Sequence, residues 1–165
     1  MREAHQLHPS AQNREADDIV SLAYDERQKS RQKVTTKNGE TIGMFLPRGT
    51  ILKHGDIVLT DDGYRIRVEA AAEVLSVVES NDGLQLLRAA YHLGNRHVML
   101  QIAPNSLAYQ HDHVLDDMVR GLGLAVGCVT APFHPEAGAY HGQASHHHDT
   151  HSDLHEHAGG HAHSH

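Results

Sequence analysis

Apolar and polar residues alternate with a period of two along much of the first half of the chain, as in β-strands with one buried face. Tyr64, Ile66 and Val68, for example, are separated by charged side chains. Asn38-Gly39 and Asp61-Asp62-Gly63 lie between such runs and are typical of the turns that join hairpin strands. The pattern predicts a small sandwich or barrel-like sheet, with strands at residues 33–36, 40–46, 56–60 and 64–70.

From residue 73 onward, runs with helical spacing separate the strand-like runs. Strands are expected at residues 73–79, 97–103, 105–110 and 124–131, and helices at residues 82–93 and 112–122. The first helix should end at Gly94, placed as a C-terminal capping glycine, and should bury Leu84, Leu87, Ala90 and Tyr91. The second should bury Val114, Leu115, Met118, Val119 and Leu122. The order β-α-β-β-α-β is that of a split βαβ, or ferredoxin-like, domain.

These patterns divide the chain into four parts and give an α+β fold class. Residues 1–16 show no apolar periodicity and are expected to be a flexible extension. Residues 17–75 form the small all-β domain, and residues 76–142 the ferredoxin-like domain. Residues 143–165 contain too few apolar side chains to fold alone and are expected to be a disordered, histidine-rich tail. Hydrophobic cores this small are only marginally stable alone. Because one face of the second sheet is left open, we expect an oligomer.

Composition excludes several classes of protein. The formal net charge of −7 argues against a nucleic-acid partner. A single cysteine, Cys128, excludes an intrachain disulfide and any CxxC motif, and we expect it to be a small buried residue. No apolar run approaches the ~18 residues of a membrane span, and the N-terminus lacks the apolar core of a signal peptide. A soluble, cytoplasmic protein with no membrane partner is therefore expected.

Histidine is the compositional anomaly, because the chain has 18 of them. Neutral imidazole is a good ligand for Ni(II), Cu(II), Zn(II) and Co(II). Ten histidines lie in the last 25 residues, with no run longer than three, which is unlike a purification tag. They are His141, His146, His147, His148, His151, His155, His157, His161, His163 and His165. This composition indicates binding of several divalent metal ions, although it does not select the metal.

Three earlier histidines are candidate ligands as well. His97 is expected at the start of a strand, where a lone histidine is usually an ordinary surface or core residue; in a two-fold dimer, two copies could meet at the axis and share one ion. His111 and His113 would project to the same side on an extended segment and could ligate together. At the start of a helix they would diverge, with Asp112 as the N-cap. Both interpretations remain open at this point. The spacing HxHxDH of a binuclear hydrolase is not met, and neither is HExxH.

Four segments together resemble the UreE family of urease accessory metallochaperones. They are YHLGNRHVMLQI at residues 91–102, YQHDHVLDDMVRGLG at 109–123, APFHPEAGAYHG at 131–142, and the histidine-rich tail. The resemblance covers residues 17–165. It implies a cytoplasmic homodimer whose first domain is similar to the peptide-binding domains of chaperones. It also implies a non-enzyme that delivers Ni(II) to apo-urease together with the urease accessory GTPase.

The resemblance also assigns roles to individual histidines. The metal-bridging histidine of the family's GNRH element falls on His97, and the accessory pair of some members falls on His111 and His113. His141, just after the GAY element, is one candidate for a ligand from the C-terminal segment, and the tail offers others. Zn(II) or Cu(II) could also bind in vitro, since imidazole alone does not select nickel. The alternative is a histidine-rich protein that stores or buffers divalent metals, in which the tail would matter most.

Overall fold

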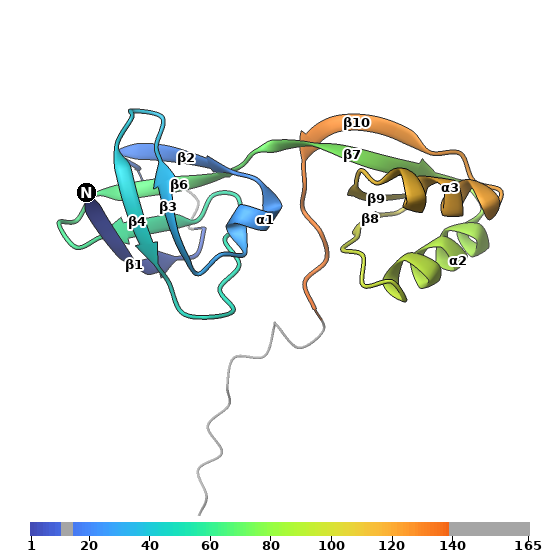
Figure 1. Ribbon diagram of the computed structural model, residues 1–165, viewed down its shortest axis with the longest axis horizontal. Helices are drawn as coiled ribbons and strands as arrows, with labels where there is room; N and C mark the ends of the chain where they lie inside the picture. Colours follow the sequence, from blue (N-terminus) through green and yellow to red (C-terminus); the bar gives the residue numbers. More distant parts are fainter. Residues whose placement is uncertain (11–14, 139–165) are drawn as a thin grey trace, which may run out of the picture.

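The computed structural model describes residues 1–10 and 15–138, which form two sheets of different connectivity (Figure 1). The first sheet has six strands in the order β2-β6-β5-β1-β4-β3. These strands are β1 (Arg2–His8), β2 (Asp18–Leu22), β3 (Arg31–Thr35), β4 (Thr41–Phe45), β5 (Ile57–Thr60) and β6 (Arg65–Ala70), and a one-turn helix α1 (Tyr24–Arg27) follows β2. The expected tail, residues 143–165, and His141 lie outside the described residues.

The two predicted hairpins are confirmed. β3 pairs with β4 and β5 with β6, both antiparallel. The turns contain Gly39 and Gly63 with φ of 85° and 82°, a conformation that glycine adopts without steric cost. In β6, Ile66 and Val68 are fully buried and the intervening residues are not, as the alternation required.

The prediction of a flexible extension at residues 1–16 is wrong for β1. This strand lies inside the first sheet, parallel to β4 and antiparallel to β5, and Ala4 is completely buried. Its pairing with β5 shifts by one residue between Ala4 and Gln6. Because a one-residue shift moves the inward positions from even to odd, Ala4 and Leu7 do not show a period of two in the sequence.

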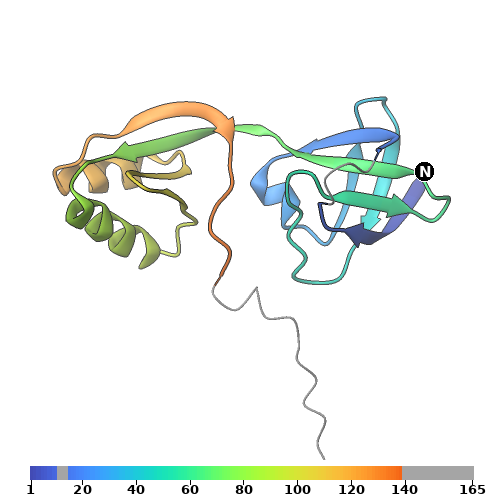
Figure 2. The ribbon, with the colours of Figure 1, turned by 180° about the vertical axis from the view of Figure 1, so that it is seen from behind.

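The second sheet has the predicted element order. Its elements are β7 (Ala72–Glu79), α2 (Gly83–Gly94), β8 (Gln101–Ala103), β9 (Ser106–Gln110), α3 (His113–Gly121) and β10 (Gly127–Pro132). The strand order is β10-β7-β9-β8, with all neighbours antiparallel. Both helices cover the same side of this sheet, as two opposite views show (Figures 1 and 2). β7 begins at Ala72, so the expected domain boundary at residue 75 falls inside this strand.

Three of the four residues predicted to be buried in α2 are exposed, and only Ala90 packs against the core, where it is partly buried. The side chains that α2 places in the core are Leu86, Ala89 and Leu93, which also follow a helical spacing. Leu84, Leu87 and Tyr91 are instead 57%, 69% and 68% exposed. The helix therefore carries two apolar stripes, and periodicity alone could not tell which one faces the core. In α3, the predicted stripe is confirmed except at Val114, which is 64% exposed. Val119 is buried, and Leu115, Met118 and Leu122 pack against the core.

A small third cluster joins the two domains. Tyr24 of α1 packs edge-on against Phe133, just after β10, and the two rings form one buried cluster with Leu75 of β7. The backbone N–H of Tyr24 donates to the Glu73 carboxylate at 2.8 Å. The buried guanidinium of Arg27 donates to the Phe133 carbonyl. The chain segment after β10 is thus fixed between the two domains.

Candidate metal centre

His97 lies in the loop that ends α2 and not on a strand, which corrects the sequence prediction, since β8 begins only at Gln101. Two hydrogen bonds close the helix: Val98 N–H donates to Leu93 O at 3.1 Å and His97 N–H donates to Gly94 O at 2.9 Å. This pair of bonds defines a Schellman motif, and it places His97 at the position that normally holds glycine. The glycine expected there, Gly94, is the last residue of the helix itself.

The backbone of His97 is left-handed, with a φ of 59°. Among the described residues, His97 is the only non-glycine residue with a positive φ. This conformation costs an L-residue roughly 1–2 kcal/mol, and it is concentrated at functional sites. The imidazole is exposed. Histidine therefore occupies a position where glycine would be more stable, with its ring available to a ligand.

His111 is held by a network of side chains. Its Nδ1 lies 3.2 Å from Asp116 Oδ2 and 3.0 Å from Ser76 Oγ. Asp116 is buried, and its other carboxylate oxygen accepts a hydrogen bond of 2.8 Å from the Tyr109 hydroxyl. Burial, followed by the nearby Asp116 carboxylate, raises the pKa of Tyr109, so this hydroxyl remains a donor. With Nδ1 occupied, Nε2 of the exposed ring is the nitrogen left for a metal, as in carboxylate–histidine–metal arrangements.

Sequence reasoning missed the role of Asp116. A signal for it was available, because Asp116 lies three residues before Val119 and thus on the buried side of α3. An acidic residue at a core position needs hydrogen-bond partners, and here Tyr109 and His111 supply them.

His113 is the first residue of α3, and Asp112 is its N-cap, accepting from the N–H groups of Val114 and Leu115 at 2.8 and 3.1 Å. Of the two arrangements considered from the sequence, the structure thus has the capped helix start. His111 precedes the cap and His113 follows it, so the pair does not lie on one extended strand. Both rings are exposed.

The segment after β10 runs beside the His97 loop. His134 N–H donates to the Gln101 side chain at 2.9 Å, and Glu136 N–H donates to Leu100 O at 2.7 Å. Glu136 is thus held beside Leu100, which lies three residues after His97. The described part of the chain ends two residues later, at Gly138. The ten C-terminal histidines named above follow this point and lie outside the described residues.

Within residues 1–10 and 15–138, one group of three metal-ligating side chains comes together, and it is not the predicted one. Glu3, His5 and Asp61, all exposed, place one ligand atom each within 4.8 Å of one another. His97, His111 and His113 are not part of any such group in the single chain. A site built on them therefore needs ligands from another copy or from the C-terminal segment.

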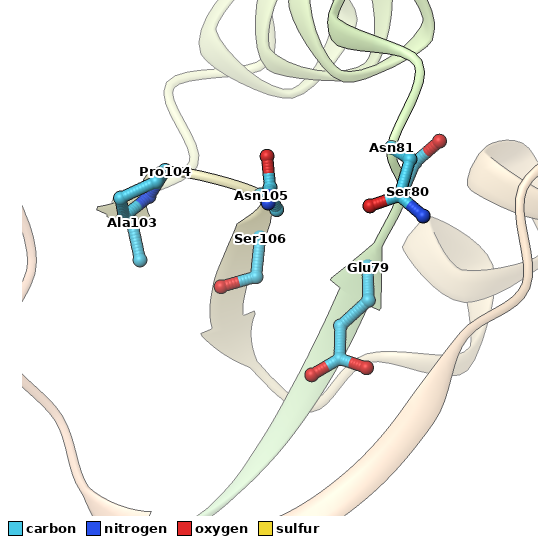
Figure 3. A pocket seen from close by; sticks show the side chains of 7 residues that line it. All are labelled: Glu79, Ser80, Asn81, Ala103, Pro104, Asn105 and Ser106. Atoms are coloured by element: carbon cyan, nitrogen blue, oxygen red, sulfur yellow. The ribbon is translucent and has the colours of Figure 1, made fainter.

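Other residues singled out by the sequence lie elsewhere. Cys128 is exposed on β10, which corrects the expectation that it is buried. Figure 3 shows a pocket where β7 ends and β8 turns into β9. Among the seven residues that line this pocket, only Glu79 is titratable, so the pocket is not a metal centre. No helix in the described part of the chain is long and apolar enough to cross a membrane.

Comparison with known proteins gives a consistent result over both domains. The family model described as UreE urease accessory protein, N-terminal domain, matches residues 2–71, and the corresponding C-terminal domain model matches residues 73–165. The urease accessory protein UreE of Teredinibacter turnerae is 52% identical over 146 residues, which is 88% of this chain and 95% of that protein. The UreE of Saccharophagus degradans is 52% identical over 148 residues, 88% of each chain, and that of Vibrio parahaemolyticus is 53% identical over 135 residues, 79% of this chain and 85% of that protein. The chain therefore belongs to the UreE family of urease accessory proteins.

Proposed function

We propose that this chain is a cytoplasmic nickel metallochaperone that carries Ni(II) to apo-urease during assembly of the urease active site, together with the urease accessory GTPase. It has no catalytic step of its own. The observation that carries the proposal is His97: an exposed imidazole at a left-handed backbone position that favours glycine. Membership in a family of urease accessory proteins is the reason for proposing urease as the recipient of the metal.

The protein acts as a homodimer in this proposal, and the exposed stripe of α2 supports it. Leu84, Leu87 and Tyr91 lie at positions i, i+3 and i+7 and run toward the end of α2 where His97 lies. A two-fold axis beside this stripe brings the same surface from each subunit together. The two His97 imidazoles then meet near the axis and hold one ion between them, in a ferredoxin-like domain that serves for dimerisation.

Further imidazoles complete the coordination shell. His111 offers Nε2 with its ring oriented by Asp116, and His113 lies two residues away. His141 follows Gly138 by three residues, a reach of about 10 Å in an extended chain, and the tail histidines reach farther. Imidazole ligands exchange more readily than a cage of thiolates would, which a metal donor requires. Affinity should fall as the solution is acidified, because protonated histidine is not a ligand.

Truncation after Gly142 distinguishes this proposal from metal storage, which the histidine content of the tail favours as the alternative. Full-length and truncated proteins are titrated with nickel by calorimetry, and each is tested for activation of apo-urease. A carrier should keep one tight ion per dimer and still support activation after truncation. Loss of nearly all bound nickel together with loss of urease activation would establish storage instead.

A further inference from the structure

A pocket of about 700 Å³ lies between the two domains, and its lining combines apolar residues with polar side chains that are nearly all positive or hydrogen-bond-donating. Arg27, Lys53 and His54 come from the first domain, and His134 comes from the segment after β10. Glu136 is the one acidic side chain in the lining. This pocket contains none of the three candidate metal ligands at positions 97, 111 and 113.

Arg27 provides a buried charge that is only partly compensated. Its side chain is 3% exposed, one terminal nitrogen donates to the Phe133 carbonyl, and its Nε has no partner within the described residues. The carboxylate whose charge acts on Arg27, Glu73, already accepts from Tyr24 N–H and from Gln110 Nε2. Burial lowers the pKa of Arg27, but an arginine this far above neutrality remains charged.

One of the two histidines of the pocket, His54, is arranged as a hydrogen-bond donor. His54 Nδ1 accepts a hydrogen bond of 3.3 Å from Ala70 N–H, so its neutral ring carries the proton on Nε2. His134 lies edge-on to it, with the ring centroids 6.2 Å apart. Burial lowers the pKa of His134, and the charge of Arg27 and the His54 ring lower it further, so the pocket is a place where additional positive charge is disfavoured. The Arg27 charge, unlike burial itself, favours a negatively charged group there.

We propose that this interdomain pocket binds a carboxylate group, with Lys53 and the Nε2–H of His54 as direct donors and Arg27 as the buried charge behind them. The apolar part of the lining, which includes Tyr24, Ile51 and Met99, suits the carbon chain that bears the carboxylate. The carboxylate comes either from a small organic acid or from this chain's own tail, where Asp149, Asp153 and Glu156 occur without any Lys or Arg. Met99 is two residues from His97, so an occupied pocket also restrains the loop that carries this histidine.

The test uses metal-free full-length protein and glutarate, a simple dicarboxylate, as the probe. NMR signals of the His54 and His134 rings are followed during a glutarate titration at low ionic strength. The proposal predicts a saturable shift of both signals and a rise in the pKa of His134. Lys53→Glu should weaken binding about tenfold or more, because it reverses an exposed charge without disturbing the fold. Lys33→Glu, an exposed lysine on β3 outside the lining, should bind glutarate as the parent protein does.

Truncation after Gly142 then identifies the source of the carboxylate. If the tail occupies the pocket, truncation shifts the His134 signal without any probe and tightens glutarate binding; if a separate acid does, neither changes. Either result supports a carboxylate site. Absence of a saturable shift in both the full-length and the truncated protein, or an equal response of Lys53→Glu and Lys33→Glu, would overturn it.

Discussion

His97 and His111 are two exposed imidazoles that the fold holds in opposite ways. His97 is placed by its backbone: two main-chain hydrogen bonds close α2 around it and force a left-handed conformation. His111 is placed by its side chain, through Asp116 and Ser76. The backbone of the first position would accept glycine more readily than histidine. At the second position, loss of the ring would leave the buried Asp116 with one partner fewer.

Because of this difference, the contribution of each histidine to metal binding can be distinguished from its contribution to folding. At position 97 the identity of the side chain contributes nothing favourable to the local fold, so its presence points to a ligand. At position 111 the side chain satisfies a buried carboxylate as well, so its presence has a structural explanation besides ligation. Variants of the two positions should therefore differ in how metal affinity and stability change together.

The largest effect is expected from Leu87→Asp, which puts a carboxylate into the exposed α2 stripe. Burying an unpaired charge in the proposed dimer interface costs several kcal/mol, so the dissociation constant of the dimer should rise about 100-fold or more. The site that needs two His97 rings should be lost with it, while the Asp116–His111 contact persists. Sedimentation and nickel calorimetry measure the two effects. Arg88→Asp, the exposed neighbour outside the stripe, is the control, and an equally weakened dimer there would contradict the role of the stripe.

Asp116→Asn tests how much the side-chain contacts that hold His111 contribute to stability and to metal binding. The substitution weakens the hydrogen bonds to Tyr109 and His111 and should destabilise the fold by about 1–3 kcal/mol. Nickel affinity should fall by about 10-fold to 100-fold, as it does when an orienting partner is lost. Thermal unfolding and calorimetry measure these changes. Tyr109→Phe, which leaves the Asp116–His111 contact in place, should reproduce the loss of stability but much less of the loss of affinity.

A smaller effect is expected at His134, a third imidazole whose surroundings oppose its charge. Burial, Arg27 and His54 lower its pKa in the folded state below the unfolded value of about 6.5. Between these two pKa values the unfolded chain binds more protons, so stability should rise with pH through this window and fall as the solution is acidified. His134→Gln should flatten this part of the stability profile measured by chemical unfolding. An unchanged profile would show that His134 is not responsible for it.

The local elements were largely predictable from the sequence because their signals are local. Asn38-Gly39 predicted a hairpin, and both helices begin within one residue of their predicted starts, with Asp82 and Asp112 as the N-caps. What could not be predicted depends on contacts distant in sequence. The position of β1 depends on a register shift against β5, and the choice between the two α2 stripes depends on which one the sheet covers.

The candidate site was predictable in its residue types but not in its geometry. The left-handed backbone of His97 could not be expected, because Gly94 offered a better capping residue three positions earlier. The network around His111 joins α3 to β7 and β9, so it requires the packed domain. The positions of the C-terminal histidines remain a prediction.

The most direct test of the account is nickel titration of His97→Gly with the mass of the complex measured alongside. Glycine suits the left-handed position, so this variant should remain a dimer and unfold at an equal or higher temperature, with a gain of about 1 kcal/mol. The account predicts that the one tight nickel ion per dimer is nevertheless lost, with affinity reduced more than about 100-fold, beyond the effect of losing an orienting residue. His8→Ala, an imidazole removed from the other domain, should keep it. A stable His97→Gly dimer that still binds one tight nickel ion would contradict the assignment of His97.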